Sequence, residues 1–380
     1  MKTIKIGVVG VGRGSTMMRF CQQTQDARLV AICDTWEEGL RKKQEELGGD
    51  IACCTSFDEF LTYDMDAIVL ANYANEHAPL AVRALDAGFH VISEVLPCQT
   101  MQEAVELVEA VERSGKVYAY AENYCFMAAP HEMRRLCREG RLGEFEYGEG
   151  EYFHNCEPIW PSITRSGKDH WRNRMYASFY CTHSLGPLLY ISGLRPVSVT
   201  GFELPLNARM ARMGAQGGSG ALEIVTLENG AILKSLHGVG CSKNSVWYSV
   251  YGSLGRLESA REDAMFGGVD RIYTNLDRRE GECFDRPETY RPGADQPSPT
   301  AGWGHGGSDY YTMRHFIDRL QGKEDAEILD VYAAMDMFLP GMFAHRSALA
   351  GGKPMAVPDL RDPAQRDLWR NDTATYFSGD

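Results

Sequence analysis

The sequence lacks the features that mark membrane-spanning, secreted and zinc-binding chains. No apolar run approaches the roughly 18 residues that a spanning helix needs. Residues 1–9 show neither the long apolar segment nor the cleavage site of a signal peptide. The 11 cysteines form no C-x-x-C pair, and an odd number cannot all pair within one chain. We therefore expect free thiols in a reducing compartment, which predicts a cytoplasmic protein with no membrane association.

Positive charge is also scarce. The chain has 39 Lys and Arg against 52 Asp and Glu, a net charge of −13. A basic surface that neutralises phosphates would have to form against this background, so we expect no nucleic-acid partner. The sequence has no H-E-x-x-H motif either, because His131 and Glu132 are followed by Met133, Arg134 and Arg135. We expect no metal site.

The first 34 residues carry a strand, a glycine-rich turn and a helix in that order. A β-rich run over residues 4–9 leads into Gly10, Val11, Gly12, Arg13, Gly14 and Ser15, and a helical pattern follows over residues 17–23. A dinucleotide-binding turn requires this context, because glycine permits the tight turn and lets backbone approach a pyrophosphate at the helix N-terminus. The third glycine position of that fingerprint holds Ser15, with Gly14 one residue early.

An acidic residue stands where the same fingerprint predicts one. The run over residues 28–33 ends at Asp34, 22 residues after Gly12, near the ~20 residues at which a carboxylate meets the adenosine ribose. Such a carboxylate accepts hydrogen bonds from ribose hydroxyls and repels a 2′-phosphate. The sequence therefore predicts NAD as the cofactor rather than NADP. The alternative is a solvated aspartate at a strand end.

Strands and helices then alternate up to residue 121. Strands are expected over residues 67–71, 90–93 and 117–121, and helices over 57–61, 77–87 and 101–114. This alternation predicts a Rossmann domain with a doubly wound parallel sheet, which we place at residues 1–125. Ligands bind at the carboxyl ends of such strands, so we expect Asn72, Glu94 and Asn123 to line the nicotinamide site.

The pattern changes after residue 143. Residues 144–152 alternate as in a strand, and two hairpins are expected, over 222–236 and 245–259. Because 380 residues exceed what one core usually supports, we predict an α/β protein with a second domain over residues 126–380. This is expected to be an α+β domain with an open, mostly antiparallel sheet, and an exposed sheet of this kind favours a homodimer or homotetramer.

The order of these motifs resembles the Gfo/Idh/MocA family, which includes glucose–fructose oxidoreductase and inositol dehydrogenase. The resemblance runs through residues 10–12, 66–72 with His77, 87–94, 121–124, 328–331 and 352–354. It implies an oxidoreductase with NAD in its first domain, and it places His77 near the cofactor and Trp171 and Arg172 near the nicotinamide. From the residues alone, His77 equally suits a helix cap and Trp171 a core position.

Two positions depart from most dehydrogenases of the family. The glutamate at position 94 is usually followed by lysine and proline, but here by Val95 and Leu96. The aspartate of the usual D-x-G-x-H stretch is replaced by Phe179, although its histidine aligns with His183. Residues 94–95, 180–187 and 304–309 instead resemble glycoside hydrolase family 109. That resemblance implies transient oxidation of a sugar hydroxyl by tightly held NAD, elimination of the aglycone, addition of water and return of the hydride.

His183 is the expected general base for a hydroxyl proton, because an unperturbed histidine titrates near neutrality. Tyr180 lies three residues earlier, which on a helical turn places both side chains on one face. We therefore predict both as catalytic; the alternative is a buried histidine beside a packing tyrosine. Lys168 and His305 are predicted substrate contacts, and His305 is equally plausible as a polar residue of a glycine-rich loop.

These observations favour an NAD-dependent enzyme that acts on a sugar or glycoside hydroxyl. In one version it is a redox-neutral, glycosidase-type enzyme that recycles its NAD, which the absent lysine and the Tyr180–His183 pair favour. In another it is a net sugar or polyol dehydrogenase that releases NADH. A third hypothesis is a non-catalytic NAD-binding sensor, since the family includes a galactose-pathway repressor; the retained His183 argues against it.

Overall fold

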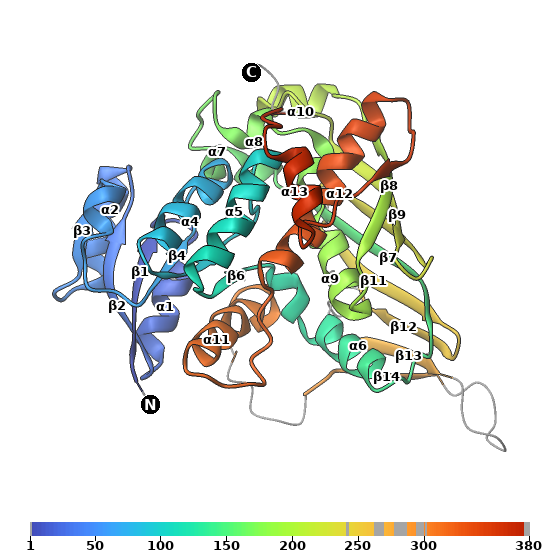
Figure 1. Ribbon diagram of the computed structural model, residues 1–380, viewed down its shortest axis with the longest axis horizontal. Helices are drawn as coiled ribbons and strands as arrows, with labels where there is room; N and C mark the ends of the chain where they lie inside the picture. Colours follow the sequence, from blue (N-terminus) through green and yellow to red (C-terminus); the bar gives the residue numbers. More distant parts are fainter. Residues whose placement is uncertain are drawn as a thin grey trace. The chain divides into compact units, whose positions relative to one another are not determined.

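The computed structural model describes residues 2–240, 243–261, 270–276, 287–293, 300 and 302–375. They form two compact units, whose elements are labelled in Figure 1. Unit 1 comprises Met1–Glu122, Asp309–Met335 and Leu360–Thr375, and unit 2 comprises Asn123–Ser308 and Asp336–Asp359. None of the described helices is both long and apolar enough to span a bilayer.

Unit 1 is built on a six-stranded parallel sheet in the order β3-β2-β1-β4-β5-β6. This is the doubly wound order of the Rossmann fold, and it confirms the predicted fold of the first domain. Its strands are β1 (Ile4–Val9), β2 (Ala27–Cys33), β3 (Ala52–Cys54), β4 (Ala67–Leu70), β5 (His90–Ser93) and β6 (Tyr118–Tyr120). The helices between them are α1 (Ser15–Gln23), α2 (Glu37–Leu47), α3 (Phe57–Phe60), α4 (His77–Asp86) and α5 (Met101–Ser114).

Two segments from the end of the chain belong to unit 1, although we expected residues 126–380 to form the second domain. Helix α11 (Ser308–Leu320) is tied to the N-terminal part by Arg314, whose guanidinium lies 2.7 Å from Asp26. Helix α13 (Pro363–Trp369) is followed by Arg370, which pairs with Glu109 of α5 at 2.7 Å. Long-range ion pairs of this kind leave no local pattern in the sequence.

Unit 2 is built on a nine-stranded sheet in the order β14-β13-β12-β11-β7-β10-β9-β8-β15. Both expected hairpins are present as antiparallel pairs, β9 with β10 and β11 with β12. The sheet is mixed, because β7 and β10 run parallel; the predicted mostly antiparallel character is confirmed. The strands are β7 (Phe145–His154), β8 (Pro196–Glu203), β9 (Gly220–Leu227), β10 (Ile232–Val239), β11 (Ser245–Gly252), β12 (Gly255–Ser259), β13 (Ile272–Leu276), β14 (Glu288–Tyr290) and β15 (Met355–Ala356).

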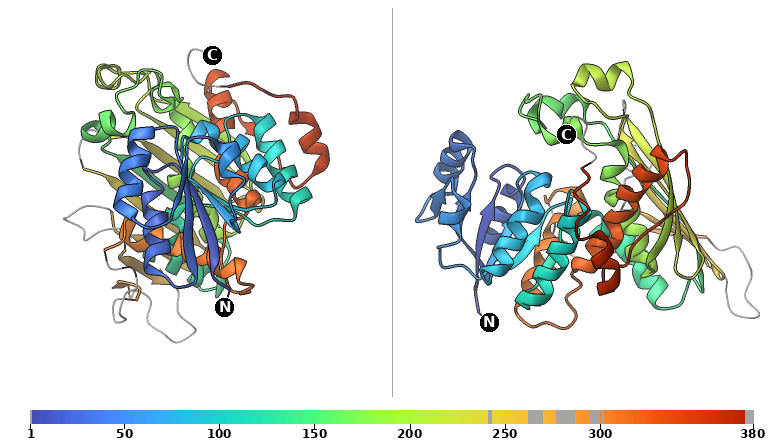
Figure 2. Two further views of the ribbon diagram at one scale, coloured as in Figure 1. Left: turned by 90° about the vertical axis from the view of Figure 1, so that its left-hand side faces the viewer. Right: turned by 45° about the horizontal axis from the view of Figure 1, so that its top comes forward.

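Helices cover one face of this sheet (Figure 2). They include α6 (Ala128–Arg138), α9 (Thr182–Ser192) and the later turns of α12 (Val331–Leu349), while α7 (Trp160–Ile163), α8 (Trp171–Arg174) and α10 (Ala208–Met213) are short. Helix α9 lies close to β7 because Gly150 has no side chain: a Cβ there would stand 2.0 Å from the carbonyl oxygen of Ser184. This close approach fixes the position of His183 in the first turn of α9.

Candidate active site

The glycine-rich turn between β1 and α1 is compact at two glycines and open at the third. Gly10 has a φ of +93°, and a Cβ there would lie 2.4 Å from the carbonyl oxygen of Ala71. A Cβ at Gly14 would lie 2.2 Å from the carbonyl oxygen of Gly10, whereas one at Gly12 would have no atom within 4 Å. Ser15 closes the turn by donating from its hydroxyl to the carbonyl of Val11 at 2.8 Å. The open surface at Gly12 leaves room for a ligand against the backbone.

Asp34 lies directly beside this turn. Its Oδ2 accepts a hydrogen bond from the Val11 N–H at 2.9 Å, and its Oδ1 accepts one from the Trp36 N–H at 2.8 Å. A carboxylate oxygen has more than one lone pair, so it can accept from a ribose hydroxyl in addition to a backbone N–H. The predicted residue therefore has a structural role as well, since it joins the turn after β1 to the end of β2.

Arg13 is held by two carboxylates of unit 1. Its Nε donates to Glu94 at 2.8 Å and its terminal nitrogens donate to Asp309, the shorter contact being 2.8 Å. Both carboxylates are buried. Although burial by itself lowers the pKa of the guanidinium, the charges of Glu94 and Asp309 raise it above its ordinary value. Arg13 and Glu94 were both predicted to bind the cofactor, and here each orients the other.

Two further predicted residues lie just after β4. The Asn72 amide donates to Glu76 at 2.9 Å, while its Oδ1 is buried and accepts no hydrogen bond from any described residue. Nδ1 of His77 donates to the carbonyl of Leu96 at 2.8 Å, so His77 holds the loop after β5. The open Gly12, the carboxylate of Asp34 and the orphaned Asn72 oxygen together fit a dinucleotide along the carboxyl ends of these strands.

In unit 2, His183 is surrounded by three tyrosines. Its ring centroid lies 4.4 Å from that of Tyr124, 4.8 Å from that of Tyr152 and 5.2 Å from that of Tyr180. The three come from different elements: the 3-10 helix η2 (Asn123–Phe126), strand β7 and the 3-10 helix η4 (Ala177–Tyr180). The Tyr248 hydroxyl donates to the His183 carbonyl at 2.6 Å and fixes the backbone. We call His183, Tyr124, Tyr152 and Tyr180 the histidine cluster.

The surroundings of this cluster keep Tyr152 protonated and His154 neutral. Burial raises the pKa of Tyr152 well above its ordinary value, and the neighbouring Tyr124 and Tyr180 raise it further. The pKa of His154 is lowered by burial and by the charges of His183, His305 and Arg172. Tyr152 can therefore donate a hydrogen bond to a bound oxygen at neutral pH.

Of the other residues predicted in unit 2, Arg172 and His305 lie beside the cluster, whereas Lys168 lies outside it. Arg172 stacks on Trp171 with its guanidinium carbon 4.3 Å from the ring centroid, and 5.5 Å from that of Tyr180. His305 lies 5.8 Å from Tyr124, measured between ring centroids. Lys168 is exposed and is not among the described residues that line the adjoining cavity. Asn123 is buried at the start of η2.

Buried polar groups support η4, the segment that carries Tyr180. The Ser178 hydroxyl and N–H both donate to Glu203, at 2.6 and 3.0 Å. Nε2 of His237 donates to the carbonyl of Ala177 at 3.1 Å, and burial lowers the pKa of this imidazole to about 4. Burial raises the pKa of the nearby Glu223 carboxyl well above its usual range. Among the described residues, no group of three or more His, Cys, Asp and Glu is arranged to hold a metal ion.

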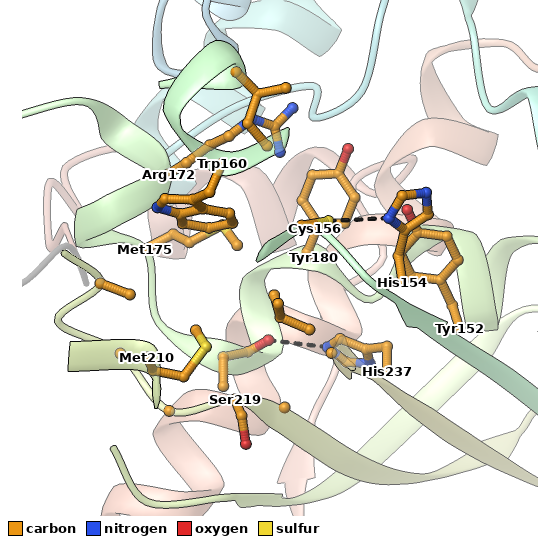
Figure 3. Close-up of a pocket in the computed structure, with 18 of the residues that line it drawn as sticks. Tyr152, His154, Cys156, Trp160, Arg172, Met175, Tyr180, Met210, Ser219 and His237 are labelled. Carbon is orange, nitrogen blue, oxygen red and sulfur yellow. Dashed lines mark hydrogen bonds between the residues drawn. The ribbon is translucent and has the colours of Figure 1, made fainter. Parts of the chain in front are cut away.

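A cavity of about 170 Å³ adjoins the cluster and shares Tyr152 and Tyr180 with it; Arg172, which lies over Tyr180, also lines the cavity. Figure 3 shows Trp160, Met175 and Met210 on one side of this cavity and Tyr152, His154 and Tyr180 on the other.

No pattern in the sequence marks Tyr124, Tyr152, His154 or Asp309 as site residues. Tyr152 and His154 belong to an alternating strand, where the sequence signals only that they share a face with residue 150.

Residues 4–122 match the family model described as "Oxidoreductase family, NAD-binding Rossmann fold". Among curated proteins, a glycosyl hydrolase family 109 protein of Solibacter usitatus is 24% identical over 393 residues, covering 94% of this chain and 88% of that protein. A glycosyl hydrolase family 109 protein of Porphyromonas gingivalis is 27% identical over 197 residues, covering 49% of this chain and 42% of its own length. An alpha-N-acetylgalactosaminidase of Shewanella oneidensis is 28% identical over 206 residues, covering 50% of this chain and 44% of its own length. The last two matches therefore span less than half of each relative.

Solved structures share the fold over nearly the whole chain. Levoglucosan dehydrogenase, determined with NADH and L-sorbose, has a TM-score of 0.78 at 17% identity and covers 95% of this chain and 100% of its own. The WlbA dehydrogenase of Bordetella pertussis, determined with NADH and UDP-GlcNAcA, has a TM-score of 0.75 at 20% identity, with 94% and 98% covered.

Proposed function

We propose that this chain, which by residues 4–122 belongs to the Gfo/Idh/MocA oxidoreductase family with its NAD-binding Rossmann fold, is an enzyme that uses NAD to act on a carbohydrate hydroxyl. The observation that carries the proposal is the buried His183 enclosed by Tyr124, Tyr152 and Tyr180. A histidine among phenols is equipped to exchange a proton with an alcohol, which is what oxidation of a carbinol requires of the protein.

In this proposal, different residues of unit 1 bind different parts of NAD. The backbone at Gly12 and the N-terminus of α1 hold the pyrophosphate, and Asp34 accepts hydrogen bonds from the adenosine ribose. Asn72 and Glu94 serve the nicotinamide half, with Glu94 held in place by Arg13. When bound, NAD supplies a two-electron acceptor for an alcohol and can return those electrons to a ketone.

The residues of unit 2 move the protons. An imidazole nitrogen of His183 takes the proton of the reacting hydroxyl. The Tyr248 hydroxyl fixes the backbone of His183 through its carbonyl. Tyr152, whose phenol stays protonated, donates a hydrogen bond to the same oxygen. Tyr180 and Arg172 lie beside this pair, and their stacked side chains limit the access of water.

We favour a redox-neutral, glycosidase-type outcome. Val95 stands where the dehydrogenases of the family carry lysine, and two of the curated relatives above are named glycosyl hydrolase family 109 proteins. A ketone on the sugar acidifies the adjacent C–H, so elimination needs a base for that proton and an acid for the aglycone oxygen. After the hydroxyl proton has passed from His183 to solvent, His183 takes the C–H proton and Tyr180, three residues earlier, gives its phenol proton to the aglycone oxygen. Addition of water then returns a proton to the carbon from His183 and a proton to Tyr180.

A net sugar or polyol dehydrogenase is the second candidate, which the dehydrogenase structures with NADH favour. Incubation with NAD and paired glycosides separates the two. Release of aglycone without absorbance at 340 nm supports the glycosidase, and stoichiometric absorbance without release supports the dehydrogenase.

His183→Ala is expected to lower turnover at least 100-fold in either case, with His131→Ala as a matched histidine control outside the cluster. Unchanged turnover in His183→Ala would contradict the proposal that this chain is an enzyme and would favour the hypothesis of a non-catalytic NAD-binding sensor.

We also propose a homodimer or homotetramer built on the outer face of the unit 2 sheet. Phe202 of β8 and Ile232 of β10 are 52% and 44% exposed there. Exposed apolar side chains on one sheet face are typical of an interface between subunits. Sedimentation of the wild type and of a Phe202→Glu, Ile232→Glu double variant tests this, and a monomeric wild type contradicts it.

A further inference from the structure

The cavity beside the histidine cluster is apolar over most of its wall. The side chains that give it this character come from η3 (Glu157–Ile159), α7, the segment after α8, α10 and β10. They are Ile159, Trp160, Ile163, Met175, Met210 and Val239. Six of its wall positions have no side chain or only a methyl group, which leaves the interior open. They are Gly217, Gly218, Gly220, Gly238, Ala177 and Ala215. Such a wall favours an apolar occupant.

Three of the polar side chains in the wall already have partners within the protein. Nε1 of Trp160 donates to Asn173 at 2.8 Å, and Nε2 of His237 donates to the carbonyl of Ala177 at 3.1 Å. Nδ1 of His154 lies 3.1 Å from Sγ of Cys156. Nδ1 of His237 is buried and accepts no hydrogen bond from any described residue, so it can serve one hydroxyl. A sugar ring carries several hydroxyls, and burying them here without partners is costly.

The size of the cavity fits a single ring. Its volume is about 170 Å³, and an apolar protein cavity of roughly 150 Å³ stays dry and binds benzene. A methyl group would leave most of this volume empty, with no partner atoms for the wall. A second fused ring exceeds it unless part of the group lies outside the cavity.

From these observations we infer that the cavity binds the aglycone of the substrate, and that this aglycone is an apolar group of one ring. The inference rests on the proposed function, because only then is the substrate a glycoside. Tyr152 and Tyr180 belong to both the cavity wall and the histidine cluster, and Arg172 of the wall lies over Tyr180. An aglycone in the cavity therefore places its glycosidic oxygen at this shared rim. The substrate class is therefore aryl or alicyclic monoglycosides rather than free sugars or oligosaccharides.

Paired glycosides test the inference directly. Methyl and phenyl glycosides of glucose, galactose and N-acetylgalactosamine, in both anomers, are assayed with the NAD-loaded full chain. For the sugar that is turned over, the phenyl member and an added cyclohexyl member, whose alcohol is as poor a leaving group as methanol, are both expected to have a kcat/KM at least ten-fold above the methyl member, because a buried ring adds apolar contact area. Equal values for the pair would overturn the inference while leaving the proposed function intact.

Two variants change the cavity in opposite directions. Ala215→Leu fills it and is expected to lower kcat/KM for the phenyl glycoside at least ten-fold, with the methyl glycoside changed less than two-fold. Met210→Ala enlarges it and is expected to favour a 2-naphthyl over a phenyl glycoside relative to wild type. Ala211→Leu is the matched control, because Ala211 is exposed on α10 and does not line the cavity. Turnover of the methyl glycoside verifies that each variant is folded.

A binding measurement separates this inference from the catalytic proposal. The fluorine-19 NMR line of 4-fluorophenol is expected to broaden saturably with wild type and Ala211→Leu, and to stay sharp with Ala215→Leu. If no glycoside is turned over but this pattern holds, the proposed function fails and the ring-binding cavity stands. If 4-fluorophenol binds none of the three proteins, or all of them equally, the cavity is not a ring-binding site.

Discussion

Replacing Gly12 by alanine separates the needs of the cofactor from those of the fold. A Cβ at Gly12 meets no atom within 4 Å, and its backbone does not have a positive φ. The substitution should therefore lower the free energy of unfolding by no more than about 0.5 kcal/mol. Alanine also restricts the unfolded chain more than glycine does, and this effect alone would raise the free energy of unfolding by about 0.4–1 kcal/mol.

The same methyl group stands where a pyrophosphate would approach the backbone. We expect the Kd for NAD to rise at least ten-fold in Gly12→Ala, which corresponds to about 1.4 kcal/mol. Isothermal titration calorimetry with NAD gives the Kd, and urea unfolding without NAD gives the stability. The combination of intact stability and weakened binding is the predicted result.

Gly14→Ala is the matched control on the same turn. Its Cβ would lie 2.2 Å from the Gly10 carbonyl oxygen and 2.6 Å from Cγ1 of Val8, so the turn must shift. We expect it to lose about 1–3 kcal/mol of unfolding free energy even without cofactor. If Gly12→Ala binds NAD as tightly as wild type, the pyrophosphate does not lie against this turn and the reasoning is refuted.

Substitutions at three other residues give further tests. Arg13→Leu leaves the carboxylates of Glu94 and Asp309 without their partner, so the free energy of unfolding in urea titrations should fall by about 2 kcal/mol. This loss is smaller than for a fully buried pair, because the Arg13 side chain is 32% exposed. An unchanged urea midpoint would contradict the prediction. Burial holds the pKa of His237 at about 4, below the unfolded value of about 6.5, so the unfolded chain takes up this proton first. The free energy of unfolding of the wild type should therefore fall by about 3 kcal/mol relative to that of His237→Gln as the pH falls from 6.5 to 4. Parallel profiles of this free energy against pH would refute the prediction. Asp34→Asn removes the charge that repels a 2′-phosphate, so the ratio of NADP to NAD affinity should rise about ten-fold in competition titrations, and an unchanged ratio would exclude that role.

The elements of unit 1 were predictable because their signals are local. Strands β1 and β5 and helix α5 begin and end where the apolar runs and flanking glycines place them. Gly115 adopts a left-handed conformation after α5, with a φ of 61°, as expected of a glycine that ends a helix. The segment between Asp34 and residue 56 was left unassigned, although it forms α2 and β3. Its helix is mostly charged, and its strand has only three residues.

Tertiary arrangement was less accessible. The parallel pairing of β7 with β10 joins residues about 85 positions apart, and nothing in either strand specifies its direction. The return of residues 309–335 and 360–375 to unit 1 depends on pairs such as Arg314–Asp26. These pairs involve ordinary surface residue types, which single-sequence patterns do not match to one another.

In the candidate site, too, the residues that are close in sequence were predictable and those that only folding brings together were not. Tyr180 and His183 are close in sequence and were paired on that ground, and their rings are 5.2 Å apart. Tyr124 and Tyr152 complete the cluster from two distant elements, so only the folded chain brings them to His183. Arg13 was assigned to the cofactor because it lies in the turn, but its guanidinium bonds to Glu94 and Asp309.

Titration of the purified protein with NAD and, separately, with NADP by isothermal titration calorimetry tests the central claim most directly. We expect saturable binding of one NAD per chain, with a Kd at least ten-fold lower than that for NADP. Absence of saturable heat with both nucleotides at millimolar concentration would contradict the cofactor site, and with it the oxidoreductase chemistry proposed for the histidine cluster.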